Sequence, residues 1–212
     1  MAWQERGYCA FVAWMGAFFI LAVSCPVYAT VLKPAKDVVA HFQNTLVMVM
    51  KNGERLGFKG RYRLLMPAVR KSHDLPFIAQ MTVGPYWGQL SKASREAFVR
   101  SFTRLTVTTY AAQFRRYDEE IFRRTAIHAV GRGDVLVETE LAAHGHKEAA
   151  IDYLLAPVGK GWQIVNIVAN GVSDLALKRA QYTTIIRKKG FPALLALLKL
   201  KTAQLAKSGA RK

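Results

Sequence analysis

The chain has 212 residues, a net charge of +17, and apolar side chains at 51% of its positions. This length suits a single domain with a sizeable core. A charge this positive favours an anionic partner, either nucleic acid or an anionic membrane surface.

The first 29 residues have the three parts of a secretory leader. Arg6 supplies a positive charge, and an uncharged apolar run then extends from Tyr8 to Val23. This run is shorter than the roughly 20 residues that span a bilayer. Val27 and Ala29 satisfy the small-residue rule of signal peptidase. We therefore predict an exported protein with a signal peptide over residues 1–29, with a retained membrane anchor and lipidation at Cys25 as alternatives.

Export restricts the chemistry of the mature chain. Both cysteines, Cys9 and Cys25, lie in the leader. Cleavage after Ala29 therefore removes them and excludes disulfides, thiol catalysis and zinc–thiolate sites. Export also excludes nucleic acid, so anionic lipid headgroups or an acidic protein become the expected counter-surface.

Helices are predicted in the first half of the mature chain. Apolar residues recur at three- and four-residue steps over residues 35–51, and Asn52-Gly53 ends this helix. A second helix is expected over residues 60–70, interrupted at Pro67, and a short third helix begins at Asp74-Leu75-Pro76. Residues 91–114 give the clearest pattern, with Ser91 as the N-cap.

The second half is predicted to form strands and then two helices. Strands are expected over residues 121–130, 134–142, 149–156 and 162–169, joined by short glycine-containing turns. Helices follow over residues 172–189 and 191–205, before a basic, flexible tail at 207–212. The expected fold is α+β: a four-stranded, curved antiparallel sheet with helices on one face, forming one domain over residues 30–206.

Catalytic and metal-binding patterns are weak. No nucleophile elbow, zinc-protease helix or phosphate-binding glycine loop is present. His144 and His146 lie in a turn, and two ligands do not make a metal site. The acidic cluster at residues 118–120 lies among arginines, which indicates solvated ion pairs. We expect no cofactor and no enzymatic activity.

Several short sequence motifs, taken in their order along the chain, resemble those of the MlaC (toluene-tolerance) family. They are Val83-Gly84-Pro85-Tyr86-Trp87, the helix from Lys92 to Leu105 with its spaced phenylalanines, Gly161-Trp162-Gln163-Ile164, and Gly171-Val172-Ser173. The likeness extends from Ala35 to Lys201. The segment Ser173–Ala176, with Arg179, Gln181 and Tyr182, is most similar to the hopanoid-associated HpnM branch. Asn166 stands where many members carry aspartate, so no role of that carboxylate is transferred.

This resemblance implies a periplasmic carrier that holds phospholipid or hopanoid tails between helices and sheet. It also implies a membrane complex of the envelope as partner. The apolar stripes of the helices and the alternation of side chains along the strands then indicate which apolar residues line the cavity. These are Leu46, Met50, Leu65, Phe77, Met81, Trp87, Phe98, Phe102, Leu105, Val137, Leu141, Tyr153, Leu155 and Ile167. The expected loop over residues 53–60 and the segment over residues 76–88 are candidate hinges for loading.

Two other functions stay open at this point. The first is an enzyme on a cone-shaped, ketosteroid-isomerase-like α+β fold, with Asp152, Tyr153 or His128 as the nearest ionisable groups. Because Asp152 and Tyr153 are adjacent in a strand, they point to opposite faces and cannot share a cavity. The second is an adaptor with a solid core that binds membranes through its basic surface.

Overall fold

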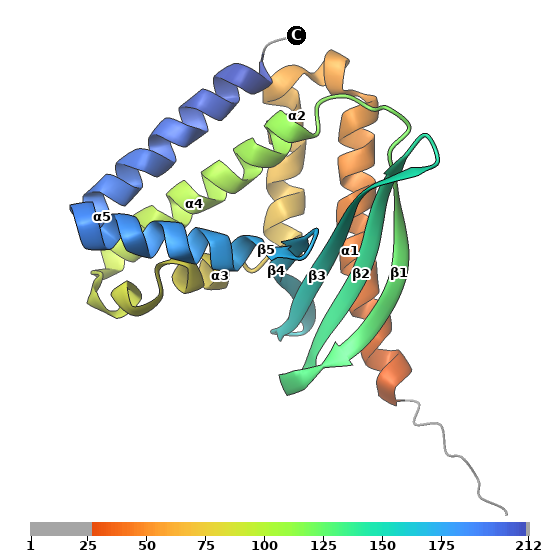
Figure 1. Cartoon of the computed structure of the whole chain (residues 1–212), viewed down its shortest axis with the longest axis horizontal. Coiled ribbons are helices and arrows are strands. Elements are labelled where there is room, and N and C mark those ends of the chain that lie inside the picture. Colours follow the sequence, from red (N-terminus) through yellow and green to blue (C-terminus); the bar gives the residue numbers. More distant parts are fainter. Residues whose placement is uncertain (1–26, 211–212) are drawn as a thin grey trace, which may run out of the picture.

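A computed structural model describes residues 27–210 (Figure 1). Along the chain, helices come before and after a set of consecutive strands. The helices α1 (Val27–Lys51), α2 (Gly53–Ser72), α3 (Leu75–Val83) and α4 (Lys92–Gln113) come first, with the 3-10 helix η1 (Gly84–Gln89) before α4. The long helix α5 (Asp174–Gly209) closes the chain. The predicted α+β class is confirmed. The predicted leader lies outside the described residues, except for Val27–Ala29, which begin α1.

The sheet is an antiparallel meander in the order β1-β2-β3-β4-β5. Its strands are β1 (Ile121–Val130), β2 (Asp134–Ala143), β3 (His146–Val158), β4 (Gly161–Ala169) and β5 (Val172–Ser173). The prediction of four strands was wrong, because β5 is a fifth strand of two residues. Asn170 and Gly171 both adopt positive φ, at 48° and 78°, so the chain turns tightly and Val172 pairs with Ala169. Two residues are too few to give an alternating pattern.

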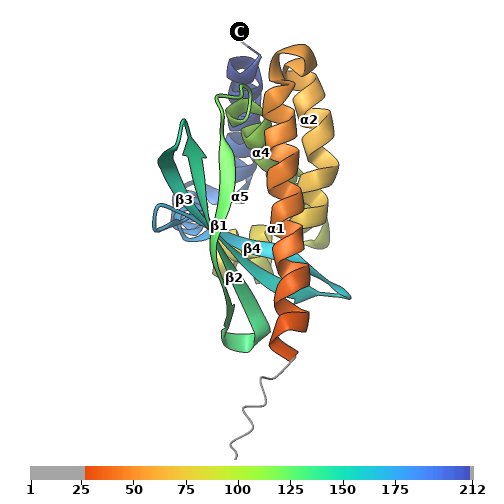
Figure 2. The ribbon, with the colours of Figure 1, turned by 90° about the vertical axis from the view of Figure 1, so that its right-hand side faces the viewer.

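One face of the sheet packs against helices. Val135, Val137 and Thr139 of β2 are buried, and they pair with Leu155, Tyr153 and Ile151 of β3. Gln43 of α1 donates a hydrogen bond to the Thr139 hydroxyl at 3.1 Å, so α1 lies against this face. Figure 2 shows α1 running alongside the curved sheet.

The first two helices are longer than predicted. α1 begins eight residues before Ala35, the expected start. The expected loop over residues 53–60 is helical, with a kink at Gly57, where φ is 57°. Pro67 does not interrupt α2, whose face with Leu65 and Val69 is buried on both sides of the proline. Tertiary packing of that face supplies the stability that the proline removes locally.

The third and fourth helices have clear start signals. The Asp74 carboxylate accepts a hydrogen bond from the Phe77 backbone N–H at 3.0 Å, and Pro76 lies in the first turn of α3. The Ser91 hydroxyl accepts from the Ser94 N–H at 3.2 Å, as predicted. Phe98, Phe102 and Leu105 then form the buried stripe of α4. These caps fix where each helix enters the core.

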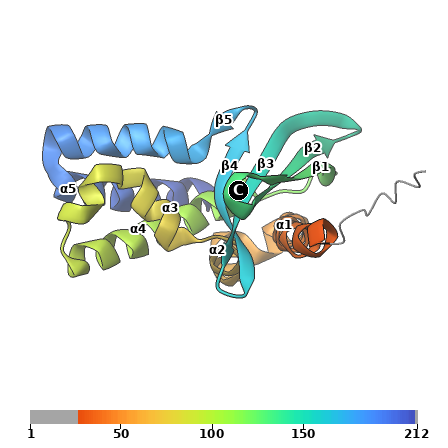
Figure 3. The same cartoon turned by 90° about the horizontal axis from the view of Figure 1, so that it is seen from below.

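α5 is one helix with a sharp bend. Gly190 has a φ of 79° and a ψ of 165°, and it divides α5 into a first arm before it and a second arm after it (Figures 1 and 3). The two predicted helices correspond to these arms. The second arm continues to Gly209, which is buried, so the expected tail begins inside the helix. None of the helices in residues 27–210 is both long and apolar enough to cross a membrane.

Candidate functional site

A cleft of about 480 Å³ lies between the inner face of the sheet, α4 and both arms of α5. Its walls are mainly apolar and come from five elements. They include Leu46 of α1, Leu105 of α4, Ile151, Tyr153 and Ile167 of the sheet, and Leu177, Tyr182 and Leu205 of α5. The bend at Gly190 is what brings the two arms of α5 to different sides of this space (Figure 1).

Polar groups are also present on the wall of the cleft. Lys178 and Lys201 are half-buried there, and Gln113 and Gln181 are exposed. Lys178 pairs with Asp174 one turn earlier in the first arm. The site therefore combines an apolar interior with amide and ammonium donors.

A small pocket of about 40 Å³ adjoins the cleft and shares Thr106, Tyr110, Ile167 and Asp174 with it. Its wall also includes His73, Leu75, Ile78, Phe102 and Leu175. Asn166 also lies here, and its side-chain oxygen accepts hydrogen bonds from the Ser173 hydroxyl and the Leu175 N–H. Ser173 is the N-cap of α5, and the Asn166 amide oxygen adds an uncharged acceptor for the N–H of Leu175 in its first turn.

His73 is a buried, neutral histidine at this position. Its Nδ1 lies 2.8 Å from the Ser72 hydroxyl, and its Nε2 lies 3.3 Å from the Tyr110 hydroxyl. The Ser72 hydroxyl also lies 2.7 Å from the Ala68 carbonyl, and when it donates there, Nδ1 carries the imidazole proton and Nε2 accepts from Tyr110. Burial lowers the pKa of His73 to about 4. The same effect raises the pKa of Tyr110 well above its usual value. Neither group exchanges protons readily at neutral pH.

The tyrosine on the sheet wall is also held in its neutral form. Burial raises the pKa of Tyr153 to about 12, while a hydrogen bond with Gln43 acts in the opposite direction. Gln43 in turn donates to Thr139, whose hydroxyl donates to the Ile151 carbonyl at 2.7 Å. The polar atoms below the cleft therefore satisfy each other and leave an apolar lining.

The structure distributes the predicted lining residues over three places. Leu46, Leu105, Tyr153 and Ile167 line the cleft, and Phe102 lines the adjoining pocket. Others are buried in the core away from the cleft wall: Met50, Leu65, Phe98, Val137 and Leu155. The remainder lie at or near the surface, with Phe77 40% exposed and Met81, Trp87 and Leu141 half-buried. Helix stripes and strand phase identify inward residues and do not separate a filled core from a cleft wall.

Sequence reasoning missed the contribution of α5 and of the polar residue Tyr110. Leu177 and Leu205 are 28 positions apart, and only the bend at Gly190 places both on the cleft. A glycine followed closely by Pro192 was the available signal for such a bend.

Of the three candidate ionisable groups of the sheet, Tyr153 lines the cleft, whereas Asp152 and His128 do not. Asp152 pairs in register with Glu138 on the opposite face from Tyr153. Burial, and secondarily Glu138, raises the pKa of Asp152. His128 is exposed, with its Nε2 3.5 Å from a Glu138 oxygen. Within residues 27–210, no group of three or more His, Cys, Asp and Glu side chains is placed to hold a metal ion.

Two other hollows are present. One of about 370 Å³ surrounds Arg61 and Arg115, between α2 and the end of α5. The other, of about 630 Å³, lies between α1, α2 and the β3–β4 turn, beside Trp162. Of the three, the cleft alone joins α1, α4 and α5 to the inner face of the sheet, so we take it as the candidate site.

Two comparisons place this architecture among known proteins. A phospholipid-binding protein from Ralstonia solanacearum, solved in complex with a phospholipid, superimposes with a TM-score of 0.70. The two sequences are 21% identical, and the match covers 83% of this chain and 98% of the other. At that identity the likeness shows the fold. Residues 41–200 match the MlaC protein family, and we conclude that the chain belongs to the MlaC family.

Proposed function

We propose that this protein is a lipid carrier that holds the acyl tails of a phospholipid in the cleft between α4, α5 and the sheet. The observation that carries this proposal is the apolar cleft between helices and sheet, with lysines and glutamines on its wall. Family membership and the phospholipid-bound structural neighbour support it. They favour a binding protein over an enzyme.

The energetics require a shielded site. Moving a methylene out of water is favourable by about 0.8 kcal/mol. Exposing the roughly 30 methylenes of a two-chain lipid to water would therefore cost roughly 24 kcal/mol, which the carrier must avoid by enclosing the tails. A cleft of about 480 Å³ is of the size that encloses a drug-like ligand. Two long chains need more room, so loading must separate α5 from α4. Gly190 is the natural hinge because it already interrupts the helical backbone.

The headgroup has a candidate position near Lys201. This lysine is half-buried on the cleft wall and forms no ion pair within residues 27–210. Gln113 and Gln181 are exposed residues that also line the cleft. An ammonium with amide donors suits a phosphate group. We therefore assign the tails to the apolar walls and the phosphate to the side that carries Lys201.

Location, cargo class and partner follow from the sequence as further parts of the proposal. The predicted leader and the family support a periplasmic protein that moves lipid between membranes. We propose a membrane complex of the envelope as its partner and an anionic membrane surface as its source or target. A hopanoid is the second candidate cargo, favoured by the HpnM-like segment from Ser173 to Tyr182.

The proposal is tested by native mass spectrometry of the exported protein, followed by solvent extraction and lipid analysis. We expect one phospholipid for each protein, or a hopanoid if the second cargo is correct. A lipid-free protein that also takes up no lipid from vesicles would contradict the carrier and favour the adaptor with a solid core.

A further inference from the structure

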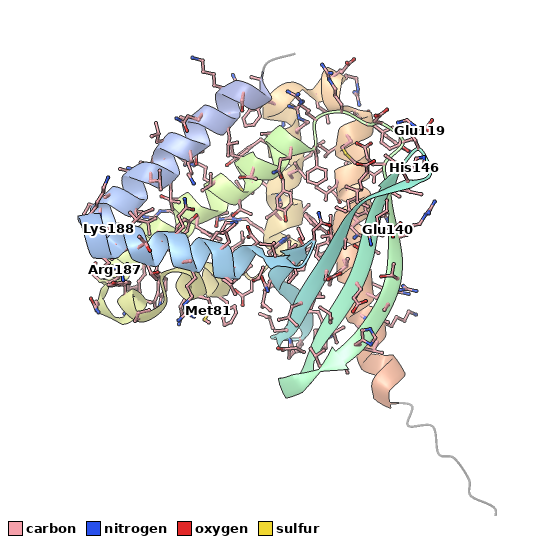
Figure 4. All side chains as sticks on the ribbon, viewed as in Figure 1. Met81, Glu119, Glu140, His146, Arg187 and Lys188 are labelled. Atoms are coloured by element: carbon pink, nitrogen blue, oxygen red, sulfur yellow. The ribbon has the colours of Figure 1, made fainter. Side chains whose placement is uncertain are left out.

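A segment without any charged residue lies at the helical end of the molecule. Residues 75–90 carry no charge, although 21% of the chain is charged. α3 buries Leu75, Ile78, Ala79, Thr82 and Val83. Its opposite side and η1 form the strip that we call the α3–η1 strip: Pro76, Phe77, Gln80, Met81, Pro85 and Trp87. The Phe77 side chain is 40% exposed, and Met81 lies on the outer side of α3 (Figure 4).

Cations surround this strip. The Arg95 guanidinium stacks on the Trp87 ring at 5.4 Å and donates to the Trp87 carbonyl at 3.0 Å. The Arg179 guanidinium packs against Gly84. A β-carbon at residue 84 would lie 3.1 Å from the Nε of Arg179. Arg187 and Lys188 are exposed at the bend of α5, at the same end of the molecule (Figure 4).

Few acids neutralise these cations. Asp74 is occupied in capping α3, and Glu96 pairs with Arg100 at 3.7 Å. α5 carries eight Lys and Arg residues and one acid, Asp174. Most of the other acids lie in residues 118–152, at the sheet end, which Figure 3 shows on the far side from the bend of α5. The helical end is therefore strongly positive.

We propose that the α3–η1 strip and the cations around it form a docking surface for an anionic phospholipid bilayer. Apolar and aromatic side chains flanked by Lys and Arg are typical of segments that lie in the membrane interface. Phe77 and Met81 enter the boundary of the acyl chains, while Arg187 and Lys188 face lipid phosphates. This surface deepens the proposed carrier function, because it places the bend of α5, and hence the hinge of the cleft, at the bilayer where lipid is exchanged.

The test is sedimentation of the exported protein with vesicles of phosphatidylcholine, with and without phosphatidylglycerol, at low and high salt. We expect binding to the anionic vesicles that salt weakens. Arg187→Gln with Lys188→Gln should weaken it by about fivefold for each charge removed. Phe77→Ser should also weaken it. Matched controls at the sheet end are Arg123→Gln with Arg124→Gln, and Ile121→Ser, whose side chain is equally 40% exposed.

Fluorescence supplies a readout that does not depend on the stability of these variants. In a Trp162→Phe variant, brominated anionic vesicles should quench Trp87. Equal losses in the control variants, no quenching, or equal binding to neutral and anionic vesicles would overturn the docking surface. Protein that carries lipid but ignores vesicles contradicts this surface alone, whereas protein that binds vesicles and never carries lipid contradicts the carrier function alone.

Discussion

Leu177 offers a sharp test of the cleft, because it lines the cleft and its side chain is nevertheless 61% exposed. Fully burying a leucine contributes about 1.5–3 kcal/mol, so covering the exposed part with a lipid tail contributes about 1–2 kcal/mol. Leu177→Ser should therefore weaken lipid retention by roughly 5- to 30-fold. Its effect on folding should stay within about 0.5 kcal/mol, because the side chain has little burial to lose.

Leu200→Ser is the matched control on the same helix, since Leu200 is 55% exposed and does not line the cleft. Both variants carry the same helix-propensity cost, so only the contact with the ligand differs. The assay follows transfer of a fluorescent phospholipid from vesicles to the protein, with urea unfolding as a check on stability. Equal lipid retention in the two variants, or a greater loss in Leu200→Ser, would refute the assignment of the cleft.

Three further predictions concern the framework around the site. Lowering the pH from 7 to 5 should reduce the free energy of unfolding by about 2 kcal/mol through His73, because its folded pKa of about 4 lies below the unfolded value of 6.5. The unfolded state therefore binds the proton first, and stability decreases as the pH is lowered. His73→Asn should flatten this part of the profile in urea unfolding, and an unchanged slope would contradict it. Gly190→Ala should cost about 1–3 kcal/mol, because φ of 79° with ψ of 165° suits glycine alone, whereas Gly131→Ala should be tolerated. Arg61→Met should cost about 3 kcal/mol or more, because Arg61 is 4% exposed and donates to the carbonyls of Gly53, Ala111 and Gly209, while the same change at exposed Arg63 should have little effect. Equal unfolding midpoints within either pair would refute these last two.

Local patterns predicted the elements that depend on local chemistry. Ser91 caps α4 and Asp74 caps α3 because a side-chain oxygen reaches an N–H three residues later. The alternation of Val135, Val137 and Thr139 placed β2 correctly because strand side chains point to opposite faces. The family resemblance was also found from short sequence motifs alone, and residues 41–200 match that family.

Errors arose where packing overrides a local signal. Pro67 was expected to interrupt a helix, yet buried residues on both sides hold α2 together. The stretch at residues 53–60 contains three glycines and was expected to be a loop. There Arg61 reaches the carbonyls of Gly53, Ala111 and Gly209, which links α2 to α4 and α5. Such contacts join residues far apart in the chain, so no local window contains them.

By itself, the sequence determined the α+β class, the position of most strands and the apolar stripes, because periodicity and capping act over a few residues. The tertiary structure decided which apolar residues surround empty space. Phe98 and Leu105 belong to the same stripe of α4, but Leu105 alone borders the cleft, because the bend at Gly190 directs the two arms of α5 differently over them. Whether an inward side chain meets another side chain or an open cleft depends on how distant segments are placed, and that is a property of the assembled fold.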